Sequence, residues 1–135
     1  SEVSSGYPFL VLDNEAGLEN LSRRIVQQVD VLIMVADPSR MGIETLLRLQ
    51  SLATEMNIRY DKLVIIINRN HNREFSGEIN AIKEKTSADL VMNFVDNIEI
   101  ASFAEKGKSL FDLPDNNEIA EQTDEMIDQL VKAPE

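Results

Sequence analysis

The residues best suited to chemistry lie near the start of the chain, where the apolar residues 9–12 end in Asp13 and Gly17 follows four positions later. A carboxylate at the carboxyl end of a parallel strand lies where doubly wound sheets bind ligands, and it can hold Mg²⁺ directly or through water. A glycine in the next turn lets a phosphate approach its backbone N–H and tolerates the backbone change of a switch. Aspartate is as common in helix caps and turns, so that alternative stays open.

An acid after a strand and a switch glycine make up only half of a P-loop nucleotide site. The other half is a glycine-rich loop that ends in Lys and Ser or Thr, and no such motif occurs in these 135 residues. We therefore expect residues 1–135 to form a single domain that is the C-terminal portion of a P-loop ATPase. We expect this portion to be inactive alone, because the P-loop holds the phosphates during transfer.

Four apolar segments rich in β-branched residues alternate with helical patterns, which predicts βαβ units on a parallel sheet. The expected strands are residues 7–12, 31–36, 63–67 and 90–95. Continuous apolar runs, such as residues 31–35, are typical of strands covered on both faces. The expected fold class is α/β, with three layers: a mostly parallel sheet with helices on both faces.

Apolar residues at a spacing of about 3.6 predict the helices that follow these strands. They are one over 18–29, one that starts at a Ser39 cap and ends near Asn57, a short one over 75–82, one over 97–106 that stops at Gly107, and one over 116–132. Asp115 or Asn116 is the expected cap of the last helix.

The composition is that of an acidic globular chain, with a net charge of −11 and 43% hydrophobic residues. Such a surface repels phosphate backbones and anionic headgroups, so we expect neither a nucleic acid nor a membrane partner. The apolar runs are too short to cross a bilayer, and residues 1–6 lack the features of a secretory signal. Together with the absence of cysteine, these features predict a cytoplasmic protein.

A longer motif is more specific than Asp13 and Gly17 alone. Residues 13–24, with the sequence DNEAGLENLSRR, closely resemble the switch II segment of the CooC-type carbon monoxide dehydrogenase maturation factors, which belong to the MinD/ParA/Mrp-like deviant P-loop ATPases. Residues 31–38 resemble the family's next strand with its trailing proline. Residues 65–69 resemble its adenine-contacting strand, and Lys106-Gly107 resembles a recurring pair. The similarity extends from about residue 7 to residue 130.

The resemblance implies a dimeric ATPase that delivers nickel to carbon monoxide dehydrogenase or a related nickel enzyme. It implies that Asp13 is the Walker B acid, linked to Mg²⁺ through water, and that Gly17 senses the γ-phosphate. It also implies that Asn68, with Arg69 beside it, contacts the adenine of ATP or ADP; one amide can both accept from and donate to that base. The family's P-loop and its Cys-x-Cys nickel ligands would both precede Ser1. Val95 is a departure, because family members carry a proline there.

Other readings of these residues remain open. Arg23, Arg24 and Arg40 are candidates for phosphate contacts or contacts with a second subunit, although exposed helix charges are commoner. We expect His71 to be solvent-exposed in a polar loop. The chain could instead be a self-sufficient flavodoxin-like interaction domain without nucleotide chemistry. It could also be another ATPase of the MinD/ParA type, although those proteins act on membranes or DNA.

Overall fold

The computed structural model describes residues 6–14, 28–72, 74 and 76–131 of the chain. Its strands are β1 (Gln28–Ala36), β2 (Arg59–Asn70) and β3 (Leu90–Val95). Its helices are α2 (Arg40–Glu55), α3 (Ser76–Thr86), α4 (Ile98–Glu105), the 3₁₀ turn η2 (Leu110–Asp112) and α5 (Glu118–Val131). The strands predicted from residue 31 onward are thus confirmed, and β1 and β2 are longer than predicted.

The three strands form a parallel sheet in the order β1-β2-β3, with β2 in the centre. Ala36 of β1 pairs with Ile67 of β2, which pairs in turn with Asn93 of β3. Helices α2 and α3 make the two crossovers that parallel strands require. All three strands therefore end at one edge of the sheet, and the residues that follow them gather there.

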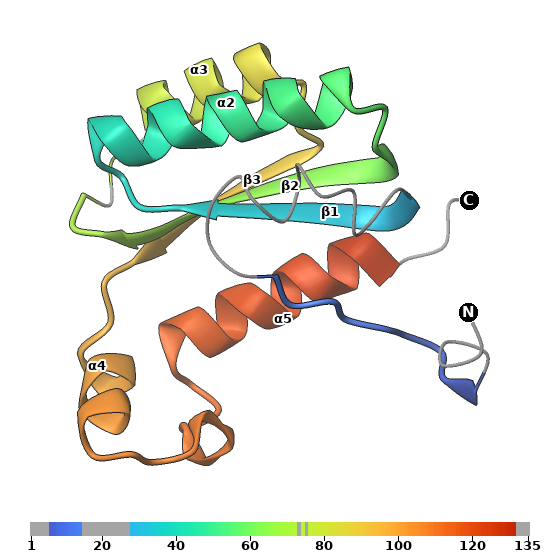
Figure 1. Cartoon of the computed structure of the whole chain (residues 1–135). Coiled ribbons are helices and arrows are strands. Elements are labelled where there is room, and N and C mark those ends of the chain that lie inside the picture. Colours follow the sequence, from blue (N-terminus) through green and yellow to red (C-terminus); the bar gives the residue numbers. More distant parts are fainter. Residues whose placement is uncertain (1–5, 15–27, 73, 75, 132–135) are drawn as a thin grey trace.

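Helices cover both faces of the sheet, as predicted (Figure 1). Helices α2 and α3 cover one face, where Leu46, Leu63 and Ile65 are fully buried. Helix α5 covers the other face, where Met126 packs with Val64, Ile66 and Phe94 of β2 and β3. The central segment 63–67 is buried on both faces, which explains its continuous apolar sequence.

Local signals set the ends of two helices where the sequence predicts them. The Ser39 side chain caps α2 by accepting a 2.9 Å hydrogen bond from the N–H of Gly42, and Asn57 beyond its end adopts a left-handed φ of 55°. Asn97 caps α4, and Gly107 follows that helix with a φ of 64°.

The last cap differs from the prediction. Asn117, rather than Asp115 or Asn116, accepts hydrogen bonds from the N–H groups of Ile119 and Ala120 at the start of α5. Its side-chain amide also reaches α4, so a tertiary contact selects among three neighbouring polar residues.

The strand predicted over residues 7–12 is wrong. Residues 8–14 form no helix or strand, and the side chains of Tyr7, Phe9 and Val11 are exposed. A strand is stabilised by hydrogen bonds to a neighbour, and the described residues provide none for this segment. The helix predicted over 18–29 lies largely outside the described residues, except that Gln28 and Val29 belong to β1.

No helix in the described part of the chain is long and apolar enough to cross a bilayer.

Candidate functional site

The candidate site is the edge of the sheet where all three strands end. Asp37 follows β1, Asn68 and Arg69 lie near the end of β2, and Asp96 follows β3. Parallel α/β sheets bind ligands at this edge, because the loops that leave the strands diverge there. The edge combines two carboxylates, one guanidinium and one amide.

A bulge near the end of β2 exposes Asn68 and Arg69 together. Ile67 pairs with Asn93 and Asn70 pairs with Val95, so two residues of β2 lie opposite one residue of β3. Asn68 and Arg69 are the two residues of β2 between these pairs. Both are exposed, whereas Ile67 and Asn70 on either side are buried. Arg69 has a φ of 58°, a left-handed conformation that costs a non-glycine residue about 1–2 kcal/mol. The surrounding contacts must therefore hold this conformation.

A network of side-chain amides lies directly behind the bulge. The Nδ2 group of Asn70, which is 2% exposed, donates a 2.8 Å hydrogen bond to Oδ1 of Asn93. Oδ1 of Asn70 accepts from the N–H of Asn72, and Nδ2 of Asn93 donates to the carbonyl of Asn72. The backbone carbonyl of Asn70 accepts from the N–H of Asp96. These bonds tie the chain after β2 to the end of β3.

Helix α5 reaches the same network from the opposite face of the sheet. Nε2 of Gln122 donates a 3.3 Å hydrogen bond to the backbone carbonyl of Asn93. The Oε1 atom of Gln122 is buried and has no hydrogen-bond partner among the residues that the structure describes. Asn93 is therefore contacted from both β2 and α5.

Arg69 lies between two carboxylates. Its Nε atom is 3.9 Å from Oδ1 of Asp96, and its side chain is 78% exposed. Its positive charge also contributes to the lowered pKa of Asp37. Nδ1 of His71 is 3.9 Å from the other oxygen of Asp96, and the His71 side chain is exposed, as expected. The edge thus carries nearly balanced charge and is not a basic phosphate cradle.

Asp37 occupies the amino end of α2. Its Oδ1 atom accepts a 2.9 Å hydrogen bond from the N–H of Ser39. The hydrogen bonds from the Ser39 side chain and backbone hold the pKa of Asp37 below its usual range. A Cβ at Gly42 would come within 2.5 Å of the same oxygen and within 2.8 Å of the backbone carbonyl oxygen of Asp37, so this close approach requires glycine. The carboxylate already supplies the negative charge that the helix dipole favours.

The structure brings some of the candidate residues together and not others. Asn68 and Arg69 lie side by side at the sheet edge, whereas Asp13 is exposed in a segment without a strand. Gly17, Arg23 and Arg24 lie outside the described residues. Arg40 forms a 3.1 Å ion pair with Glu44 on α2, and both side chains are exposed. Arg40 thus fits the commoner alternative, an exposed helix charge.

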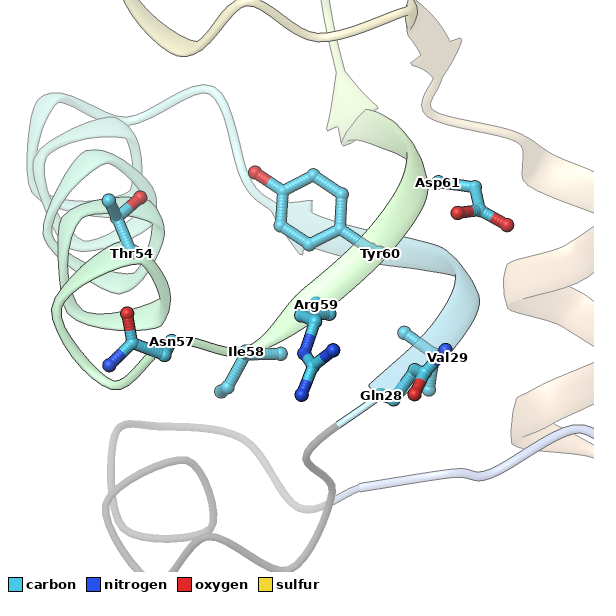
Figure 2. A pocket seen from close by; sticks show the side chains of 8 residues that line it. All are labelled: Gln28, Val29, Thr54, Asn57, Ile58, Arg59, Tyr60 and Asp61. Carbon is cyan, nitrogen blue, oxygen red and sulfur yellow. The ribbon is translucent and has the colours of Figure 1, made fainter.

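A hollow of about 580 Å³ lies at the opposite edge of the sheet, where β1 and β2 begin (Figure 2). Its lining includes Asn57, Arg59 and Tyr60. Within the described residues, no three His, Asp or Glu side chains come together as a metal site. We place the candidate site at the carboxyl edge, because the strand ends bring the polar side chains together there.

Sequence reasoning missed Asn70 and Asn93. The predicted strand ends at Ile67 and places His71 in a polar loop, whereas β2 continues to Asn70 beyond the bulge. The available signal was the pair of asparagines at positions 68 and 70, because alternate residues in a regular strand share a face. The bulge breaks that alternation and exposes only the first.

Comparisons with known proteins find two relatives. The chain is 33% identical to the uncharacterized ATP-binding protein MJ0685 of Methanocaldococcus jannaschii over 129 residues, which are 96% of this chain and 51% of that protein. It is also 33% identical to the uncharacterized ATP-binding protein MJ0823 of the same organism over 88 residues, 64% of this chain and 32% of that protein. No family model and no solved structure matches. The chain thus spans about half the length of MJ0685, and the relatives that it resembles are named for binding ATP.

Proposed function

We propose that this chain is the base-binding and switch portion of an ATP-dependent nickel-delivery protein that acts in the maturation of carbon monoxide dehydrogenase or a related nickel enzyme. The observation that carries the proposal is the exposure of Asn68 and Arg69 together in the bulge of the central strand. The similarity to two proteins named for ATP binding supports the nucleotide. The switch-like sequence of residues 13–24 supports the nickel-delivery family.

The chemistry of the edge suits the adenine base better than the phosphates. The Asn68 amide can accept from the exocyclic amino group of adenine and donate to a ring nitrogen. The exposed guanidinium of Arg69 can stack on the face of a base. Asp37 and Asp96 would repel phosphates, which must then be held by a P-loop elsewhere in the protein.

The remaining parts of the proposal concern the reacting end of the nucleotide. Asp13 would hold Mg²⁺ through water, which fits an ion that keeps several waters and binds few carboxylates besides the phosphates. Gly17 would sense the γ-phosphate. Nickel would bind to cysteines outside this chain, since the chain has none. We further propose that the protein acts as a homodimer.

The test is a titration of the ¹⁵N-labelled chain with AMP and with GMP. We expect AMP to shift the side-chain amide signals of Asn68 with a dissociation constant of roughly 1 mM, about −4 kcal/mol, and GMP to bind more weakly. Asn68→Ala should abolish the preference for AMP, and Asn116→Ala, at an exposed amide beyond the sheet edge, should keep it. Equal shifts with both nucleotides, or none, would favour an interaction domain without nucleotide chemistry.

Nickel delivery needs a separate assay with the complete protein. ATP-dependent activation of nickel-free carbon monoxide dehydrogenase should require both nickel and hydrolysable ATP. Activation that proceeds equally with a non-hydrolysable analogue would remove the ATPase from this role.

A further inference from the structure

We propose that Asn93 is a positioning residue that, through Asn70, holds Asn68 and Arg69 in the conformation that binds the base. This inference rests on the proposed function for the identity of the ligand. Its structural part, the order of Asn68 and Arg69, can be measured without any nucleotide. Asn93 lies on β3 and Asn70 on β2, and their side chains share a 2.8 Å hydrogen bond.

The first step of the argument is that the bulge needs external support. Asn68 and Arg69 lie opposite a single residue of β3, and Arg69 has the left-handed φ of 58°. A non-glycine residue keeps such a conformation only where its surroundings enforce it. The ordinary path would continue the β2 ladder beyond Ile67 and would place residues 68 and 69 on opposite faces.

The second step is that Asn70 supplies this support. It is the first residue after the bulge that pairs with β3 again, and it is 2% exposed. Its backbone carbonyl accepts a 3.0 Å hydrogen bond from the N–H of Asp96, and its Oδ1 accepts one of 3.0 Å from the N–H of Asn72. Asn70 therefore fixes the chain on the far side of the two exposed residues.

The third step is that Asn93 fixes the orientation of Asn70. Oδ1 of Asn93 accepts from Asn70, while Nδ2 of Asn93 donates 3.2 Å to the carbonyl of Asn72. Rotation of either amide by half a turn would bring like groups together, so the pair admits one arrangement. Gln122 of α5 holds the Asn93 backbone from behind. The position of the base-binding residues is thus set by a side chain on the neighbouring strand.

The experiment compares the chain with Asn93→Ala, Asn93→Asp, Asn70→Ala and the control Asn80→Ala, at an exposed asparagine of α3. The first readout is nucleotide-free: ¹⁵N relaxation and backbone chemical shifts at Asn68 and Arg69, with amide exchange of the buried segment 63–67 as a measure of global folding. We expect Asn93→Ala and Asn70→Ala to make Asn68 and Arg69 mobile. The amide-exchange rates of residues 63–67 should stay within severalfold of those in the parent chain.

Asn93→Asp separates the hydrogen bond through Asn70 from simple packing. The carboxylate still accepts from Asn70 but cannot donate to the Asn72 carbonyl, so the order at Arg69 should fall between that of the parent chain and that of Asn93→Ala. The second readout is AMP affinity, which should weaken about fivefold to tenfold in Asn93→Ala and remain unchanged in Asn80→Ala.

The two readouts separate the two ideas. Unchanged order at Asn68 and Arg69 in Asn93→Ala would overturn the positioning role, whatever the nucleotide does. A parent chain that does not distinguish AMP from GMP would overturn the proposed function and leave the structural result to be judged by the relaxation data. If Asn93→Ala unfolds globally, Asn93→Asp and Asn70→Ala decide: the positioning role fails if both keep the order of the parent chain.

Discussion

The side chain of Asn117 donates a 3.0 Å hydrogen bond from Nδ2 to Oδ1 of Asn97, and this bond joins the caps of two helices. Oδ1 of Asn97 also accepts from the N–H of Ile100 at the start of α4. Oδ1 of Asn117 accepts from two N–H groups at the start of α5. One amide pair therefore fixes where α5 begins, and α5 is the helix that covers the β2–β3 face of the sheet.

Asn117→Ala should lower the free energy of unfolding by about 2–4 kcal/mol, because it removes a helix cap and the hydrogen bonds that the buried Asn117 side chain makes to Asn97 and Glu99. The nearby exposed Asn116→Ala should change it by less than about 0.5 kcal/mol. Urea unfolding monitored by circular dichroism measures both values. Equal effects of the two substitutions would show that neither the cap nor the bond to Asn97 stabilises the fold.

Asn117→Asp separates the cap from the tertiary bond. The carboxylate keeps the capping oxygen but loses the bonds to Asn97 and to Oε1 of Glu99, which lies 3.0 Å from Nδ2 in the parent chain. Repulsion from Glu99 should make this variant less stable than the parent chain at pH 7. Full stability of Asn117→Asp would assign the whole effect of Asn117→Ala to the cap.

The helix caps show how far the sequence predicts this fold. Ser39 and Gly107 act through bonds to residues a few positions away, so a local pattern reveals them. Asn117 is chosen over Asn116 by a partner 20 positions earlier in the chain, and no local pattern contains that partner. The sheet with helices on both faces was predictable for the same reason as the helix ends at Ser39 and Gly107, because apolar periodicity is also a local pattern.

The candidate site shows the same division. Asn68 could be singled out because it follows an apolar strand, and the structure places it at the sheet edge. The bulge, the left-handed Arg69 and the Asn70–Asn93 bond arise from pairing between β2 and β3, which the sequence of either strand alone does not encode. The strand predicted over residues 7–12 is wrong because pairing is not local. Their apolar pattern suits a strand, but the described residues contain no partner strand that pairs with them.

Asp37→Asn should destabilise the chain at neutral pH and lose that effect in acid. The folded-state pKa of Asp37 is lowered by its hydrogen bonds with Ser39 and by Arg69, so the ionised carboxylate stabilises the fold above the unfolded pKa of 3.8. This stabilisation disappears as the pH falls through the lower, folded-state pKa. Urea unfolding of both chains at pH 7, 5 and 3 should show the difference shrinking toward pH 3; a difference that grows in acid would contradict the assignment.

Without Mg²⁺, the chain should bind adenosine and AMP at least as well as ATP. Each added phosphate brings negative charge toward Asp37 and Asp96, on a chain with a net charge of −11. Isothermal titration with the three ligands, repeated with Mg-ATP, checks the order. A dissociation constant of ~1 μM for Mg-ATP, or roughly −8 kcal/mol, would mean that the chain holds the phosphates itself.

In a protein that carries this chain together with a P-loop, Asp13→Asn should lower kcat by about tenfold to a hundredfold and change nucleotide affinity little. The carboxylate acts through the metal on charge that develops during transfer, whereas the P-loop makes most ground-state contacts. Asp30→Asn, an exposed aspartate of β1, is the matched control and should leave kcat unchanged. Steady-state ATPase kinetics decide, and an unchanged kcat for Asp13→Asn would remove this residue from the site.

The chain by itself should associate into dimers or larger species. Strand β1 has a hydrogen-bonded neighbour on one side only within the described residues, and Ile33 and Val35 on it are 42% and 57% exposed. Phe9 and Val11 add further apolar surface, at 66% and 88% exposure. Open strand edges and apolar patches of a few hundred Å² commonly find a partner.

Val35→Lys tests this expectation, because a lysine on an edge strand opposes pairing with a second copy. Size-exclusion chromatography with light scattering should give a mass of at least twice 15.2 kDa for the parent chain and a shift toward the monomer for Val35→Lys. Met41→Lys, at a 77% exposed residue of α2 rather than of the strand β1, is the control and should not change the mass. A parent chain that stays monomeric at about 100 μM and binds no hydrophobic dye would show that its apolar surface is covered in solution, which would favour the self-contained interaction domain over a portion of a larger ATPase.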